Sequence, residues 1–150
     1  MNKKLIIIRH AHRDKIDNNP DNGLSPKGEK QARNLKKFFK KTYCESPELI
    51  LTSPKKRCRE TVAPLLKKSL AFKVSPLLDE GAPLEQKVSA FIQWWGKNAP
   101  SFTVVCSHGD WVPLCVQKLT GQGIELKKGG LIEIQSDGKN VLLNAIIQEP

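Results

Sequence analysis

The stretch Leu5-Ile6-Ile7-Ile8-Arg9-His10-Ala11 decides the fold class of this chain. Its four apolar residues form a short run without polar alternation, which is typical of a strand buried on both faces. A polar loop follows over residues 14–23. Ser25-Pro26 then predicts the start of a helix, because serine caps a helix and proline suits its first position. The apolar stripe of this helix is Ala32, Leu35, Phe38 and Phe39.

The alternation of strand and helix patterns continues along the chain. Further strands are predicted over residues 49–51, 72–74 and 102–106. One helix is predicted to start at Ser53-Pro54, and Pro64 predicts a kink or an early stop in it. A second is predicted from Leu84 to near Gly96, and a third from a cap at Asp110 to before Gly121. Residues 131–134 and 141–146, joined through Asp137-Gly138, predict a closing hairpin. The pattern therefore predicts an α/β fold: a three-layer α/β/α sandwich around a mostly parallel sheet.

Length and composition agree with one globular domain over residues 1–150. The chain is 39% hydrophobic and 27% charged, which excludes a largely disordered protein. No apolar run is long enough to cross a bilayer, so we expect a cytoplasmic protein that does not act at a membrane. The four cysteines show neither a C-x-x-C pair nor a zinc spacing, and buried free thiols are expected.

The formal net charge of +10 favours an anionic partner: a nucleic acid, an acidic protein surface or a phosphorylated ligand. Composition alone does not choose among these three. Pairs of lysines are spread along the chain, and pairs at helical spacing usually form a solvated face. The pairs are Lys36–Lys37, Lys40–Lys41, Lys55–Lys56, Lys67–Lys68 and Lys127–Lys128.

Residues suited to phosphate chemistry follow the predicted parallel strands. His10, preceded by Arg9, comes two residues after the first strand, and His108 comes two residues after the fourth. Arg57 lies in the first turn of the helix after the second strand, and Glu80 lies in the loop after the third. Because ligands in open α/β sheets bind beyond the carboxyl ends of the strands, we expect these side chains at one rim. Guanidinium groups bind phosphate oxygens, a neutral imidazole can attack phosphorus, and a carboxyl group can protonate the leaving atom.

Five segments in order resemble the histidine phosphatase superfamily, which has the phosphoglycerate mutase-like fold. Arg9-His10-Ala11 is similar to its first histidine motif, and Val104 to Gly109 is similar to its second. The other segments resemble its L-[ST]-x-x-G-x-x-Q-A, S-P-x-x-R-x-x-x-T and L-x-E patterns, and they are Leu24 to Ala32, Ser53 to Thr61, and Leu78 to Glu80. The compact plan is similar to the small bacterial phosphohistidine phosphatases.

The resemblance implies a role for each matching residue. His10 would be the nucleophile that becomes phosphohistidine, and Arg9, Arg57 and His108 would hold the phosphoryl oxygens. Glu80 would be the proton donor, with Asp79 as the alternative. Gly109 would belong to the substrate-binding segment after His108. The resemblance implies neither a metal nor another cofactor. Nearby cations should also keep His10 neutral and nucleophilic.

The chain departs from the family pattern after the nucleophile. His12 and Arg13 stand where the family usually has glutamate and its neighbour, and they either widen the anion site as substrate-binding residues or are merely exposed. Ile16 replaces an asparagine of the mutase-like members, and no cap segment is inserted. These features argue against sugar-phosphate mutase activity. We expect a monomeric phosphatase that acts on phosphohistidine or another phosphoprotein.

Several alternatives remain open at this point. The chain could hydrolyse small phosphate esters, or it could be a non-catalytic module that binds phosphate or nucleic acid. Stacking of nucleic-acid bases on Trp94, Trp95 and Trp111 is disfavoured, because their helical spacing suits core packing better. A zinc site built from histidines and Asp110 is disfavoured too, because Arg9 repels a cation.

Overall fold

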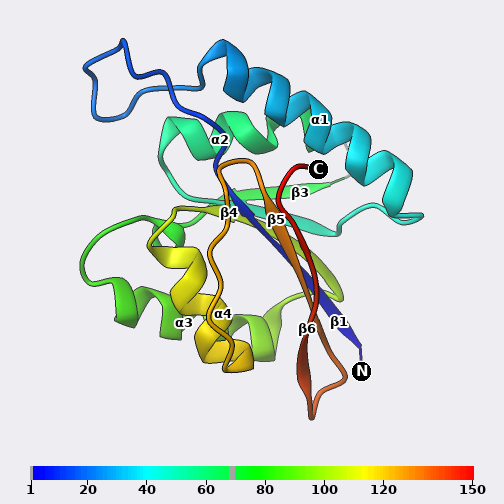
Figure 1. The fold of residues 1–150 in the computed structure, drawn as a ribbon. Coiled ribbons are helices and arrows are strands. Elements are labelled where there is room, and N and C mark those ends of the chain that lie inside the picture. The colour runs from blue at the N-terminus through cyan, green and yellow to red at the C-terminus, as the bar shows by residue number, and fades with distance from the viewer. Residues whose placement is uncertain (1, 68–69) are drawn as a thin grey trace.

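The computed structural model describes residues 2–67 and 70–150, so Lys68 of the fourth lysine pair lies outside the described residues. The described residues form a six-stranded sheet in the order β3-β2-β4-β1-β5-β6 (Figure 1). The strands are β1 (Lys3–Arg9), β2 (Leu49–Thr52), β3 (Ala71–Val74), β4 (Phe102–Ser107), β5 (Leu131–Ser136) and β6 (Val141–Ile147). The helices are α1 (Pro26–Thr42), α2 (Lys56–Val62), α3 (Leu84–Asn98) and α4 (Trp111–Thr120), with short 3₁₀ segments η1 (Ala63–Leu65) and η2 (Pro76–Leu78).

The sheet is parallel over four strands and antiparallel at one edge. β3, β2, β4 and β1 pair in parallel. β5 runs antiparallel to β1, and β6 returns antiparallel to β5. The predicted mostly parallel sheet with a closing hairpin is therefore confirmed.

Two helical layers cover the sheet, and the buried centre of β1, Leu5 to Ile8, sends alternate side chains to opposite faces. Ile6 and Ile8 pack in a cluster with residues of α1 and α2. Leu5 and Ile7 pack in the other cluster, with residues of α3 and α4. Figure 1 shows the two pairs of helices on opposite sides of the sheet. The three-layer α/β/α architecture is confirmed.

The second helix starts later than the sequence predicts. α2 begins at Lys56, its N-cap is Lys55, and no side chain caps it. The predicted start at Ser53-Pro54 is wrong: the Ser53 hydroxyl accepts from the Lys55 amide at 3.3 Å, in a turn before the helix, and lies 2.8 Å from His108 Nε2. The predicted early stop is confirmed: α2 ends at Val62 and passes into η1, which contains Pro64.

Three smaller expectations also need correction. α3 continues through Gly96 to Asn98, since an isolated glycine costs a helix only about 1 kcal/mol. Asp110 holds the N-cap position of α4 but makes no capping hydrogen bond, because its Oδ2 accepts from the Gly81 amide at 2.9 Å. Cys44 is exposed, whereas the other three cysteines are buried thiols as expected.

The tryptophans expected in the core lie there: Trp95 and Trp111 are buried, and Trp94 packs against the same cluster. Across residues 2–67 and 70–150, none of the helices combines the length and the apolar character that a membrane span requires.

Candidate active site

The register of the sheet brings four strand ends to one level. Arg9 pairs with Ser107, Thr52 pairs with Cys106, and Val74 pairs with Thr52. Parallel strands in this register end together, so the residues that follow them share one rim. His10, Ser53 and His108 each come directly after a strand of this set.

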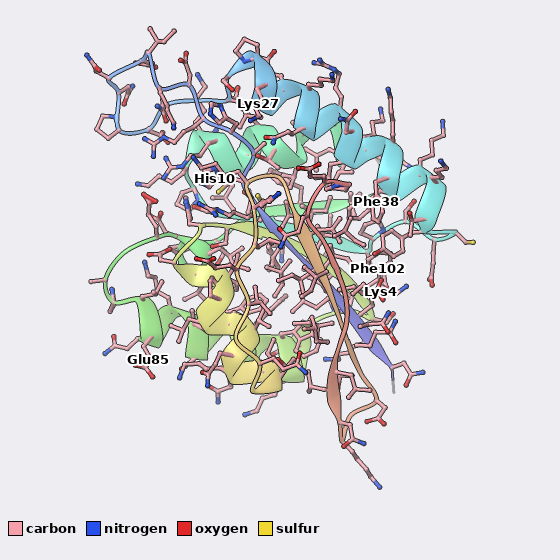
Figure 2. The ribbon with its side chains drawn as sticks, viewed as in Figure 1. Lys4, His10, Lys27, Phe38, Glu85 and Phe102 are labelled. Carbon is pink, nitrogen blue, oxygen red and sulfur yellow. The ribbon has the colours of Figure 1, made fainter. Side chains whose placement is uncertain are left out.

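His10 is held in one tautomer by the backbone. Its Nδ1 lies 2.8 Å from the Ala11 carbonyl oxygen, which can only accept, so Nδ1 carries the proton. The lone pair of the ring therefore lies on Nε2. The His10 side chain is buried, and its ring centroid lies 5.4 Å from that of His108. Figure 2 shows His10 at the end of β1.

The environment of His10 favours the neutral ring. Burial is the largest cause that lowers its pKa, and the charges of His108, Arg57 and Arg9 lower it further, while the hydrogen bond to Ala11 opposes them; the pKa falls to about 3. A ring with this pKa is unprotonated at neutral pH and keeps its Nε2 lone pair available.

Arg57 and His108 contact the same carboxylate. Arg57 Nη2 donates to both oxygens of Glu80, at 2.7 Å and 2.6 Å. His108 Nδ1 lies 3.2 Å from Glu80 Oε2, and Arg57 Nη2 lies 3.4 Å from the same Nδ1. Arg57 and His108 are only 1% and 2% exposed. The arrangement thus holds an anion beside a buried guanidinium and a buried imidazole.

Glu80 is ionised in this arrangement. Burial raises its pKa, but the hydrogen bond from Arg57 and the charges of His108 and Arg57 lower it below the ordinary value. Asp79 lies on the other side of His108, with Oδ1 3.8 Å from Nε2, and it also accepts from the Glu80 amide at 2.8 Å. Of the two carboxylates, Glu80 alone is paired with Arg57.

Arg9 is positioned by backbone groups. Its Nη1 donates to the Leu126 carbonyl at 2.7 Å, while its buried Nε has no partner within the described residues. The guanidinium passes so close to Gly109 that an added Cβ there would lie 2.8 Å from Nη2. Gly109 therefore leaves room for Arg9 beside His108.

His12 and Arg13 lie at the edge of this group, and both are half-buried. His12 Nδ1 is 2.6 Å from Ser25 Oγ. Arg13 Nε donates to Asn22 Oδ1 at 2.9 Å, which ties it to the loop over residues 14–23. Substrate binding by these two residues stays a prediction.

Polar residues to which the sequence analysis assigned no place in the site contact the two histidine segments. Thr61 Oγ1 accepts from the Ala11 amide at 2.9 Å, and Gln31 Oε1 accepts from the His12 amide at 2.9 Å. Ser53 contacts His108. All three occupy lettered positions of the quoted motifs, which was the available signal. Asp110 and Lys87 bind the backbone of the Glu80 loop and carried no such signal.

No set of three histidine, cysteine, aspartate or glutamate side chains in residues 2–67 and 70–150 is placed to hold a metal ion. Two residues of the zinc site weighed in the sequence analysis have other partners: His12 Nδ1 contacts Ser25, and Asp110 Oδ2 accepts from the Gly81 amide.

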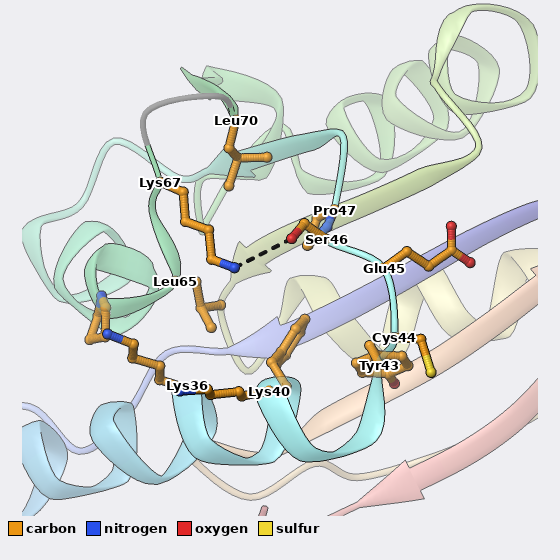
Figure 3. Close-up of a pocket in the computed structure, with 12 residues that line it drawn as sticks. Lys36, Lys40, Tyr43, Cys44, Glu45, Ser46, Pro47, Leu65, Lys67 and Leu70 are labelled. Atoms are coloured by element: carbon orange, nitrogen blue, oxygen red, sulfur yellow. Dashed lines mark hydrogen bonds between the residues drawn. The ribbon is translucent and has the colours of Figure 1, made fainter.

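A cavity of about 440 Å³ lies elsewhere, at the far end of α1 (Figure 3). Lys36, Lys40 and Tyr43 line it from α1 and its end, and Lys67 Nζ lies 3.4 Å from Ser46 Oγ across it. None of the predicted site residues lines this cavity.

Several solved structures share the fold of this chain. The protein histidine phosphatase SixA, solved with tungstate, has a TM-score of 0.84 at 21% identity, covering 97% of both chains. A candidate alpha-ribazole-5'-P phosphatase from Escherichia coli has a TM-score of 0.83 at 20% identity, covering 98% of this chain and 97% of that one. Phosphoserine phosphatase from Entamoeba histolytica has a TM-score of 0.72 at 18% identity, covering 97% and 96%.

These likenesses establish the shared fold. Among curated proteins, none matches this sequence. A family model described as histidine phosphatase superfamily (branch 1) matches residues 5–83, which is more than half of the chain. By this match over the segment that contains the first histidine motif and Arg57, the chain belongs to the histidine phosphatase superfamily.

Proposed function

We propose that this protein is a phosphatase that removes a phosphoryl group from phosphohistidine, or from another phosphorylated side chain, through a phosphohistidine intermediate on His10. The observation that carries the proposal is the state of His10: buried, neutral, with Nδ1 donating to Ala11 and Nε2 unprotonated beside Arg57 and His108. The family membership supports it.

The chemistry follows in two displacements. His10 Nε2 attacks phosphorus, the bond from phosphorus to the leaving oxygen or nitrogen breaks, and the electron pair stays on the leaving atom, which takes up a proton. Water then attacks the phosphorus of phospho-His10, and the pair of the breaking P–N bond returns to Nε2. Arg9, Arg57 and His108 stabilise the negative charge on the phosphoryl oxygens in both steps.

The ionisation state of Glu80 favours a substrate with a good leaving group. Its carboxylate is paired with Arg57 and ionised before substrate binds. An incoming phosphoryl group would displace it from Arg57, and the loss of that partner would raise its pKa and let it hold a proton. Imidazole leaves phosphorus readily and needs little acid assistance, so a phosphohistidine suits this site better than an alkyl phosphate.

The test is a substrate panel with the wild type and His10→Ala. The panel contains phosphohistidine, phosphoserine and phosphotyrosine peptides, p-nitrophenyl phosphate and an alkyl phosphate, with phosphate release as the readout. We expect the highest kcat/KM for the phosphohistidine peptide, and a loss of at least about 1,000-fold for His10→Ala because no other residue can form the intermediate.

Trapping with ³²P-labelled substrate should label the wild type, with acid-labile and alkali-stable label, and should not label His10→Ala. The circular dichroism spectrum of His10→Ala serves as the folding control. Substantial turnover by His10→Ala would contradict the mechanism. A far higher kcat/KM for a small ester than for any phosphopeptide would contradict the protein substrate alone.

A further inference from the structure

A cavity of about 600 Å³ lies beside the nucleophile segment, and its lining contains several basic side chains and one acidic side chain, Glu149. Its basic lining residues come from three parts of the chain: His12 after β1, Lys27 and Lys30 on α1, and Lys127 and Lys128 before β5. We call it the basic cavity. Figure 2 shows Lys27 at the start of α1.

Within the described residues, most of these lysines lack an anionic partner. Within residues 2–67 and 70–150, Lys127 Nζ pairs with Glu149 at 3.6 Å on one side of the cavity. Lys27, Lys30 and Lys128 form no ion pair there with any described carboxylate. Lysines on solvated surfaces need no partner, but here they share one hollow, so an anion that enters would meet several of them together.

The cations are close enough to repel one another. Burial and the charges of Lys15, Arg9, Arg13 and Lys27 lower the pKa of Lys128. Burial and the charges of Lys128, Lys15 and Lys27 likewise lower the pKa of His12. An anion bound among these groups would relieve the repulsion.

Two of the segments that line the basic cavity lie next to His10. His12 lies two residues after His10, so their backbones are at most about 7 Å apart. The Gly129 amide, next to Lys128, lies 3.1 Å from both the Arg9 and the His10 carbonyl oxygens. A peptide with its phosphoryl group on His10 would therefore place its neighbouring residues over or near this cavity.

We propose that the basic cavity binds acidic side chains that flank the phosphorylated residue of a protein substrate. Charge complementarity selects carboxylates, and the distance from His10 restricts them to residues close to the phosphorylated one. The proposal rests on the proposed function and adds a sequence preference to it. Lys27, Lys128 and His12 are then specificity-determining residues rather than catalytic ones.

The experiment compares two phosphohistidine peptides that differ only in their flanks, one with Asp and Glu and the other with Asn and Gln. We expect the wild type to prefer the acidic peptide about tenfold in kcat/KM, which corresponds to two exposed ion pairs of ordinary strength. The Lys27→Ala/Lys128→Ala double variant should reduce this preference to about twofold or less.

The matched control is Lys36→Ala/Lys40→Ala, which removes the same charge from the cavity at the far end of α1 (Figure 3). At 1.5 Å per residue, these lysines lie about 14 Å and 20 Å from Lys27 along the helix. We expect this control to keep the preference for the acidic peptide.

Each other outcome overturns the proposal. Equal kcat/KM for the two peptides in the wild type removes the acidic preference but leaves the proposed function intact. An equal loss in both double variants shows a general effect of net charge. Hydrolysis of neither peptide rejects the proposed function as well. Stronger inhibition by single-stranded DNA than by an unphosphorylated acidic peptide of equal charge would assign the cavity to nucleic acid.

Discussion

At the scale of single residues, burial decides the chemistry of His10. An exposed histidine has a pKa near 6.5 and is partly protonated at neutral pH. In this site, burial and three neighbouring cationic groups lower the pKa of His10 to about 3. The unfolded chain binds a proton at His10 more readily than the folded chain does. Acid therefore destabilises the folded state.

This linkage predicts a loss of stability in acid. Between about pH 3 and pH 6.5 the unfolded state binds more protons at His10 than the folded state, so the free energy of unfolding rises with pH. Above pH 6.5 this contribution of His10 has its full value. From pH 7 to pH 5 the wild type should lose about 2 kcal/mol more than His10→Gln. Urea unfolding at both pH values measures this difference. If the free energies of unfolding of the two proteins change equally with pH, burial does not lower the pKa of His10.

At the scale of elements, the start of α1 is fitted to the nucleophile segment. The Ser25 side chain caps the helix through the Gly28 amide at 3.1 Å, and the Ser25 amide donates to the His12 carbonyl at 3.0 Å. A Cβ on Gly28 would overlap that same carbonyl oxygen. Gly28 thus allows α1 to approach the backbone that carries His10.

Two glycine substitutions test this approach. Gly28→Ala should lower the free energy of unfolding by about 2 kcal/mol or more, because backbone cannot move aside as a flexible side chain can. Gly96→Ala is the matched control within α3: nothing lies within 4 Å of an added Cβ there, and alanine should raise the free energy of unfolding by about 0.5–1 kcal/mol. Denaturant unfolding measures both. Equal effects of the two substitutions would contradict the close approach.

At the scale of the whole molecule, the net charge of +10 acts over longer distances than the site contacts. Exposed lysines attract an acidic protein through water, where salt screens them; the Debye length falls from about 10 Å at 0.1 M to about 3 Å at 1 M. Arg57 and His108, which we propose bind the phosphoryl group, are buried, and buried charges are screened less.

Salt should therefore weaken the attraction of an acidic substrate to the protein surface more than it affects the reaction in the buried site. Raising NaCl from 0.05 M to 0.5 M should lower kcat/KM for an acidic phosphopeptide by about fivefold or more, and by less than half that factor for p-nitrophenyl phosphate. Steady-state kinetics on both substrates, with a neutral-flank phosphopeptide as the control, measures the effect. The same salt dependence for all three would mean that the lysines only solvate the surface.

The order of elements and the rim of the sheet could be predicted from the sequence, because both depend on local patterns. The apolar run of β1 predicts a buried strand, and topology then directs the residues after parallel strands to one edge. His10, Arg57, Glu80 and His108 were found this way. Helix starts were less predictable: Ser53 has the chemistry of a cap, but a tertiary contact with His108 outweighs it.

By itself, the sequence determined the layered fold and the residues that could perform phosphoryl transfer. Only the tertiary structure decided their states, because burial, pairing and distance depend on parts of the chain far apart in sequence. It ionises Glu80 through Arg57, holds Nδ1 of a buried His10 on Ala11, and gathers His12, Lys27 and Lys128 around one cavity. The charges of these lysines could be read from the sequence, but their convergence required the folded chain.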